Sequence, residues 1–263
     1  MTTYLELTYL DLAFAALLLV FNAGLSLALG LRLEGRMLLA AVRMVVQLLL
    51  VGLVLQALFT QASVWLTGLV ALIMALFAGR EILARQERRL KGWWGYGIGS
   101  GTMLLAGLVV TILALNGPLR PDPWYDPRYA IPLFGMILGN GMNAAALAAD
   151  RLAGEMETRS AEIEAYLALG ASSVRAAREP VRRALRASMI PTVNSLMVVG
   201  IVSLPGMMTG QIIAGSDPLV AIRYQIVVMF MLASAVALAA VVVVLGYRRT
   251  FFNPAEQLRP KDG

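Results

Sequence analysis

The sequence predicts an all-α, polytopic integral membrane protein, and its composition and long uncharged runs carry that prediction. Hydrophobic residues make up 59% of the 263 residues, charged residues make up only 14%, and the mean hydropathy is +0.74. Soluble domains have roughly 25% charged residues. Several uncharged runs reach the length of about 20 residues that a membrane-spanning helix needs. We therefore expect a multi-pass protein of the cell (inner or plasma) membrane, with the lipid bilayer and not nucleic acid as its surroundings.

The apolar runs predict about seven crossings. The first is residues 12–31, which are uncharged. The next run, 37–79, has 43 residues and would form a helix about 65 Å long, twice the apolar thickness of a bilayer. We expect it to fold back at 60–63 and so to cross twice. The remaining crossings are expected within 95–115, 131–149, 187–216 and 219–246.

Basic residues give these crossings an orientation. The loops after the first, third, fifth and seventh crossings hold 2, 5, 7 and 4 basic residues, whereas the alternate loops hold only Arg120 and Arg128. The positive-inside rule then places the N-terminus outside and the C-terminus in the cytoplasm. No Lys or Arg precedes Arg32, so we expect the first crossing to belong to the mature protein and not to a signal peptide. We expect one transmembrane domain over 1–263, with a cytoplasmic segment at about 151–189.

The stretch from Met156 to Pro191 is the only long polar run in the chain. Ile163, Leu167 and Val174 are among its apolar residues, which recur at helical spacing. Gly170, followed by Ala-Ser-Ser, indicates a helix stop and a new N-cap, so we expect two short amphipathic helices joined by a tight turn. Such a pair is suited to docking a partner protein. The alternative is a basic segment that lies on anionic lipid headgroups.

Two sets of residues carry a family resemblance. Glu164-Ala165-x-x-x-Leu169-Gly170 resembles the E-A-A-x-x-x-G loop with which permeases of ABC transporters engage their ATPase subunit. The runs 131–143, 150–152 and 203–218 resemble the FetB-type permeases, an iron-export family that also includes plant aluminium-tolerance proteins. The resemblance implies a permease subunit that works with a separate ABC ATP-binding subunit. It also implies an ATPase-coupling surface at Glu162, Glu164, Ala165, Leu169, Gly170 and Arg175.

The residues themselves also favour a separate ATPase. The chain has no G-x-x-x-x-G-K-[ST] phosphate loop, and its only lysines are Lys91 and Lys261. We expect no cofactor on this chain, no enzymatic activity of its own, and ATP with Mg²⁺ on the partner subunit. Because permease halves usually pair, we also expect a homodimer. The chain has no cysteine and no histidine, which excludes disulfides and thiolate or imidazole metal sites.

Polar residues inside the expected crossings are candidates for a substrate path. Arg43 and Gln47 are four residues apart on one helix face, although Arg43 is also placed to snorkel. Asn140 and Asn143 share a face and must meet other helices or water, either as interhelical hydrogen bonds or as substrate ligands. Arg223 lies near the expected outer mouth, where Tyr224 and Gln225 suggest a polar rim.

A helix break is expected in the sixth crossing, at Pro205 and Gly206. Proline removes a helix hydrogen bond, and broken helices at membrane depth are tolerated where they line a cavity. Thr209 and Gln211 follow at once, so this segment is our candidate gate; a kink filled by packing is the alternative. The chain's 14 methionines, Met207 among them, are either soft metal ligands or adaptable packing, and the sequence leaves open whether a metal binds directly.

Other functional classes fit less well. A retinal protein needs a lysine within a crossing, and an intramembrane enzyme needs a catalytic pair that the crossings lack. A secondary transporter or a seven-helix receptor stays open as the alternative to an ATP-driven permease, which would export iron, another metal or a small solute.

Overall fold

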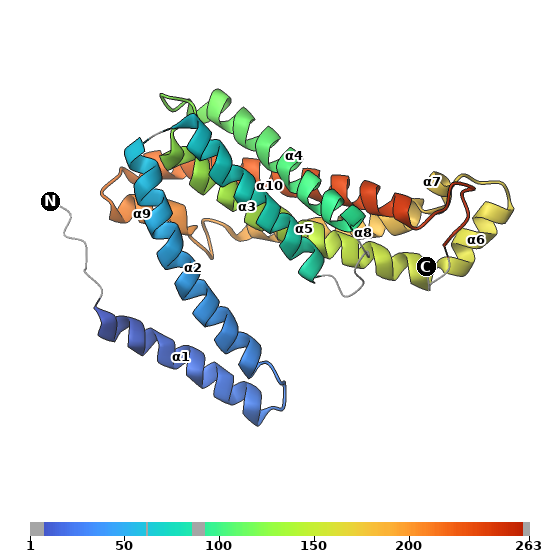
Figure 1. Ribbon diagram of the computed structural model, residues 1–263, viewed down its shortest axis with the longest axis horizontal. Coiled ribbons are helices and arrows are strands. Elements are labelled where there is room, and N and C mark those ends of the chain that lie inside the picture. The colour runs from blue at the N-terminus through green and yellow to red at the C-terminus, as the bar shows by residue number, and fades with distance from the viewer. Residues whose placement is uncertain (1–7, 62, 86–92, 260–263) are drawn as a thin grey trace. The chain divides into compact units, whose positions relative to one another are not determined.

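The computed structural model describes residues 8–61, 63–85 and 93–259, and most of these residues are helical. No strand occurs among these residues, and the predicted all-α class is confirmed. The elements are α1 (Tyr9–Ala28), α2 (Glu34–Gln61), α3 (Val64–Arg85), α4 (Trp93–Ala114), a π-helical turn η1 (Leu115–Leu119), α5 (Pro127–Thr158), α6 (Ser160–Ala168), α7 (Ser173–Ala176), α8 (Arg178–Val198), α9 (Gly206–Ile213) and α10 (Pro218–Thr250). Figure 1 shows their order along the chain.

Six of the described helical segments are long and apolar enough to cross a membrane: Leu10–Ala28, Glu34–Gln61, Val64–Ile82, Gly99–Leu119, Pro127–Thr158 and Pro218–Thr250. The predicted crossing at 187–216 is not one helix, because α8 ends at Val198 and α9 begins at Gly206. The predicted turn at 60–63 coincides with the end of α2 and the start of α3, although Ala62 lies outside the described residues. Arg88, Arg89, Lys91 and Lys261 of the basic loops also lie outside them.

The contacts divide the chain into two compact units. The first contains α1 and α2 together with Ile213–Gly215. Within it, α1 and α2 contact each other, and the turn between them is held by Ser26. The Ser26 hydroxyl donates to a Glu34 carboxylate oxygen at 3.1 Å and accepts the Leu33 N–H at 3.1 Å. These bonds satisfy polar groups that α1 and α2 would otherwise leave unpaired at their ends.

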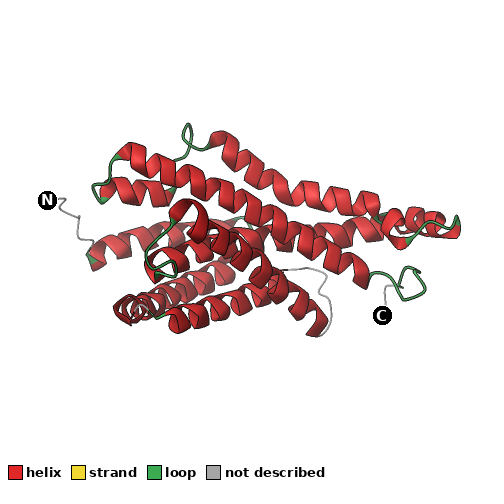
Figure 2. Ribbon diagram, turned by 90° about the horizontal axis from the view of Figure 1, so that it is seen from above, coloured by secondary structure: helices red, strands yellow, loops and turns green. Residues whose placement is uncertain are grey.

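The second unit is built around α5, which contacts α3, α4, α8 and α10 (Figure 1). Figure 2 shows that helices joined by loops make up the described residues. Small residues let these neighbours approach closely: a Cβ added at Gly141 would lie 3.4 Å from the Cβ of Ala239, on α10. The main core joins Phe134, Leu138 and Leu152 of α5 to Val243 of α10. Because α5 is buried on most sides, it fixes the positions of the helices that form the candidate site. The prediction of a single transmembrane domain stays a prediction.

Candidate functional site

The predicted turn at Gly170 is confirmed by its backbone. Gly170 has φ +81°, a conformation that side chains with a Cβ rarely adopt. The Gly170 N–H donates to the Leu167 carbonyl at 2.9 Å, and the Ala171 N–H donates to the Tyr166 carbonyl at 3.0 Å. These bonds close the end of α6 in the way that glycine-terminated helices do. The chain then turns into α7.

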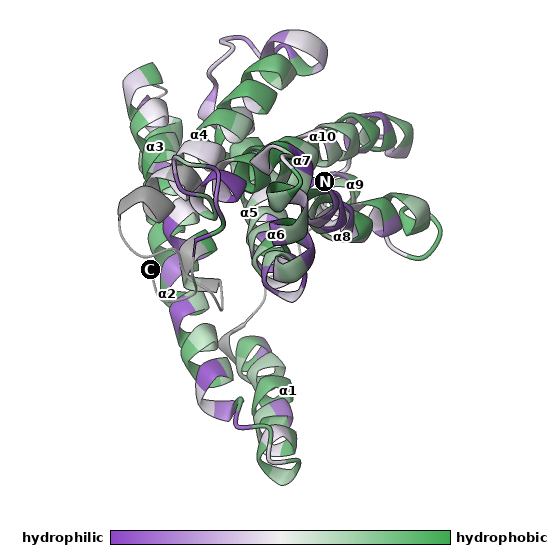
Figure 3. Ribbon diagram, turned by 90° about the vertical axis from the view of Figure 1, so that its right-hand side faces the viewer, coloured by the Kyte–Doolittle hydropathy of each residue, from purple (hydrophilic) through white to green (hydrophobic). Residues whose placement is uncertain are grey.

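The segment 160–177, which we call the docking segment, presents much of its surface outward. Glu164, Ala165 and Arg175 are exposed. Leu169 is 84% exposed, and Tyr166 and Val174 are exposed as well. Hydrophilic residues of α6 and α8 are visible in Figure 3. The exposed leucine and tyrosine are apolar groups that a partner could cover.

Ion pairs tie the docking segment to α5 and α8. Arg159, between α5 and α6, binds the predicted coupling residue Glu162 at 2.7 Å and lies 4.0 Å from Glu179 of α8. Arg183 of α8 binds Glu179 at 3.1 Å and lies 3.7 Å from Glu155 of α5. The hydrogen bond from Arg183 holds the pKa of the Glu179 carboxyl below its ordinary value. Glu162 is thus paired with Arg159 while its side chain stays 44% exposed, and its coupling role stays a prediction.

A C-terminal contact that the sequence did not reveal also holds this segment. The Ser173 N–H, at the start of α7, donates to a carboxylate oxygen of Glu256 at 2.9 Å. Glu256 stands in a short turn in which Asn253 and Gln257 bond to each other and Phe252 is buried. The Ser172 side chain makes no cap hydrogen bond, so the predicted N-cap is provided instead by a residue 83 positions away. No local sequence pattern could have indicated it.

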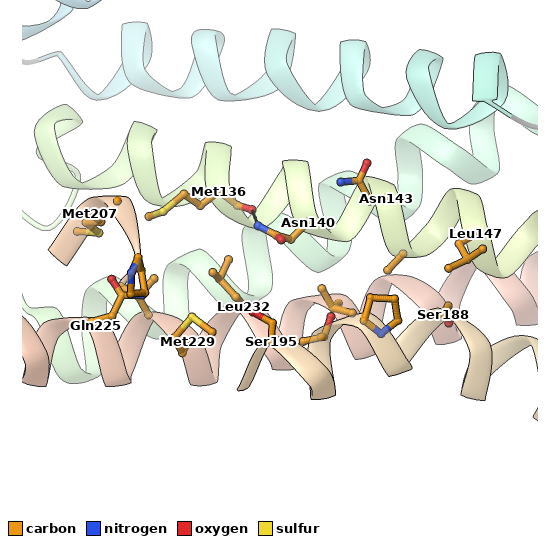
Figure 4. A pocket seen from close by; sticks show the side chains of 17 residues that line it. Met136, Asn140, Asn143, Leu147, Ser188, Ser195, Met207, Gln225, Met229 and Leu232 are labelled. Atoms are coloured by element: carbon orange, nitrogen blue, oxygen red, sulfur yellow. Dashed lines mark hydrogen bonds between the residues drawn. The ribbon is translucent and has the colours of Figure 1, made fainter. Parts of the chain in front are cut away.

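A cavity of ≈ 390 Å³ lies among α5, α8, α9 and α10. Its lining consists of uncharged side chains: Met136, Asn140, Asn143, Ala144, Leu147, Ser188, Pro191, Thr192, Ser195, Pro205, Gly206, Met207, Gln225, Val228, Met229, Leu232 and Val236. Figure 4 shows Asn143, Leu147 and Ser188 toward one end and Met136, Met207 and Gln225 toward the other. The cavity is large enough for a small solute or a metal complex.

Four of the predicted path residues line this cavity, namely Asn140, Asn143, Pro205 and Gly206. The amide nitrogen of Asn140 donates to the Met136 carbonyl in its own helix at 2.9 Å. The other predicted residues do not line it. Thr209 donates its hydroxyl to the Pro205 carbonyl at 3.1 Å, and Gln211 is half-buried on α9. Arg223 is exposed on α10, and Arg43 and Gln47 are exposed on α2 of the other unit.

Gln225 lies in the cavity and not on an outer rim. It is 7% exposed, and its side-chain oxygen has no hydrogen-bond partner among the described residues. Gln225, Met229, Leu232 and Val236 follow at helical spacing, so one face of α10 supplies a wall of the cavity. Ser188, Thr192 and Ser195 of α8 were also missed, because single hydroxyl residues on a helix carry no distinctive pattern.

The predicted break near Pro205 is present but longer than a kink. Residues 199–205 are not helical, and Gly200 turns the chain with φ +85°. The segment exposes Ile201, Val202 and Leu204. Because the helix stops at Val198, Pro205 stands at the start of α9, and both Pro205 and Met207 are brought to the cavity wall.

This fold defines a multi-pass helical membrane protein. It has a cavity with an uncharged lining among α5, α8, α9 and α10, and an exposed polar segment at 160–177. The model of the family described as "Uncharacterised protein family (UPF0014)" matches residues 9–252, and the chain belongs to this family. No solved structure matches the chain.

Three relatives cover nearly the whole chain. The UPF0014 membrane protein slr1647 of Synechocystis is 40% identical over 97% of this chain and 97% of its own length. The Escherichia coli protein named "Probable iron export permease protein FetB" is 35% identical over 96% and 95%. The Arabidopsis thaliana protein ALUMINUM SENSITIVE 3 is 36% identical over 93% and 88%. They confirm the predicted family and the multi-pass membrane location.

Proposed function

We propose that this chain is the membrane-spanning permease subunit of an ABC transporter, and that a separate ATP-binding subunit docks on the segment 160–177. ATP and Mg²⁺ belong to that subunit. One observation carries the proposal: α5 and α8 each extend from the docking segment to the cavity. From Leu147 to Thr158 is about 16 Å of α5, and from Arg178 to Ser188 is about 15 Å of α8. Two rigid helices therefore connect the partner surface to the substrate space.

The shape of the docking segment supports this role. Gly170 allows a sharp reversal, Arg159 links Glu162 of α6 to Glu179 of α8, and Arg183 links α8 to Glu155 of α5. A push on α6 would therefore move the two cavity helices together. The exposed Leu169 and Tyr166 offer apolar anchors, and Glu164 offers a charge for a basic group on the ATPase.

The cavity is the proposed substrate site, with Asn140, Asn143 and Gln225 as its hydrogen-bonding groups. The name of the Escherichia coli relative indicates iron export, and we propose export of a metal ion, a metal complex or a small solute for this chain. Two copies would pair with two ATPases, because alternating access needs two halves that move against each other.

The proposal is tested by purifying the tagged chain from its own membrane and measuring subunit stoichiometry and ATP hydrolysis. We expect two copies of this chain with two ATP-binding subunits. Leu169→Glu should release the ATPase, whereas the control Arg151→Ala, an exposed change on α5, should retain it. Flux in vesicles driven by an ion gradient, without ATP or an ATPase, would instead support a secondary transporter.

A further inference from the structure

Three methionines from three different helices line the cavity. Met136 comes from α5, Met207 from the first turn of α9 and Met229 from α10, and all three line the cavity. Figure 4 shows Met136, Met207 and Gln225 grouped at the same end, with Met229 next along α10. Gln225 and Met229 are four residues apart, so their side chains share one helix face. The thioethers are thus part of the cavity wall.

The buried amide of Gln225 is a second, independent observation at the same place. Its side-chain oxygen has no hydrogen-bond partner among the described residues, although the residue is 7% exposed. An unpaired buried oxygen costs free energy unless something in the cavity satisfies it. A cation placed among the methionines would do so.

The charge of the lining restricts which cation fits. No carboxylate lines the cavity, and the chain has no histidine or cysteine. Divalent and trivalent cations lose more hydration free energy than monovalent ones on entering a site of low polarity, because this cost rises with the square of the charge. Thioethers are soft ligands that select Cu(I) over harder ions. Neutral sulfur ligands and an amide oxygen therefore match a soft, singly charged cation.

We propose that this end of the cavity binds Cu⁺, or its analogue Ag⁺, through the thioether sulfurs of Met136, Met207 and Met229, with the Gln225 oxygen beside them. The proposed ion binding is argued from the cavity lining alone. As a statement about the transported substrate, it rests on the proposed permease function. Met207 stands next to the break between α8 and α9, so a change in that break would remove one ligand and release the ion.

Binding is tested on the purified full chain with Ag⁺ as a redox-stable probe, in buffer without thiols or chloride. We expect one Ag⁺ per chain by titration calorimetry, with no competition from Mn²⁺ or Fe²⁺. Cu⁺ should give sulfur neighbours in X-ray absorption spectra. Met136→Leu, Met207→Leu and Met229→Leu should each weaken binding by about tenfold or more, which is about 1.4 kcal/mol.

Met208→Leu is the matched control, because Met208 is buried beside Met207 and does not line the cavity. It should leave the affinity for Ag⁺ unchanged. Equal weakening by Met207→Leu and Met208→Leu, or a Cu⁺ spectrum without sulfur neighbours, would overturn the inference. Tight Ag⁺ binding without ATP-driven transport of Cu⁺ would leave the binding site standing and would exclude Cu⁺ as the transported substrate. ATP-driven transport of another solute, without Ag⁺ binding, would overturn the inferred ion site and leave the proposed permease function standing.

Discussion

The docking segment and the cavity hold their polar groups in opposite ways. Around the docking segment, Arg159 and Arg183 pair with three carboxylates, and Glu256 caps α7 from a distant part of the chain. In the cavity, the polar groups are neutral, and the Gln225 oxygen is left without a partner among the described residues. Charges that are paired internally fix a shape, whereas neutral groups with spare bonding capacity are available to a ligand. One region is therefore suited to transmitting force and the other to binding.

The largest expected effect comes from changing the backbone of the docking segment. Gly170→Trp places a side chain at φ +81° and should distort the turn between α6 and α7. We expect loss of ATPase coupling, with transport reduced by about tenfold or more and insertion unchanged. The control is Gly154→Ala on α5, where an added Cβ meets nothing within 4 Å. Normal coupling in Gly170→Trp would place the ATPase contact elsewhere.

A change at Gln225 in the cavity should lower transport without lowering the stability of the protein. Gln225→Leu removes an unpaired buried oxygen, so the thermal stability of the protein should stay the same or rise. Transport should nevertheless fall, because a ligand contact is lost. Thermal unfolding and vesicle flux, measured on the same preparation, compare the stability of the variant with its transport rate. A variant that loses stability and keeps full transport would show that Gln225 serves packing.

Asn143→Leu extends this test to the other end of the cavity. Asn143 is an exposed residue of α5 and is part of the cavity lining, so the change should reduce substrate affinity with little loss of folding. Leu147→Ala, one turn further along α5, is the comparison, since it removes no polar group. Substrate concentration curves for both variants measure the effect. Identical substrate concentration curves for the two variants would indicate that Asn143 serves contacts between helices and does not bind substrate.

A smaller effect is expected at the C-terminal contact. Glu256→Gln keeps the size of the side chain and weakens its bond to the Ser173 N–H, because a neutral amide accepts a weaker hydrogen bond than a carboxylate. The amides of α7 should exchange faster with solvent, and coupling should fall partially. Hydrogen exchange followed by mass spectrometry measures the exchange rate of the α7 amides. Unchanged exchange in α7 would mean that the remaining contacts hold it.

The smallest effect is a dependence on pH at Glu179. Its pKa is lowered by the hydrogen bond from Arg183, so its contribution to stability is present above the ordinary carboxyl pKa. That contribution is lost as the pH falls through the lowered value. Melting temperatures of the native chain and Glu179→Gln should therefore differ near neutral pH and converge in acid. A constant difference at all pH values would contradict this role.

The sequence alone determined the membrane class, the all-α fold and the turn at Gly170, but it predicted about seven crossings where six described segments are long and apolar enough to cross. Long apolar runs and the restricted backbone of glycine and proline act locally, so they can be identified without a fold. Asn140, Asn143 and Pro205 were recognised because polar groups and proline are unusual within apolar runs. Only the tertiary structure decided which of these residues face one cavity. Gln225 and the three methionines line one cavity because α5 packs against α10 and α9 begins beside them, and Glu256 reaches Ser173 because the chain after α10 returns to the docking segment. Such contacts join residues far apart in the chain, and no local pattern encodes them.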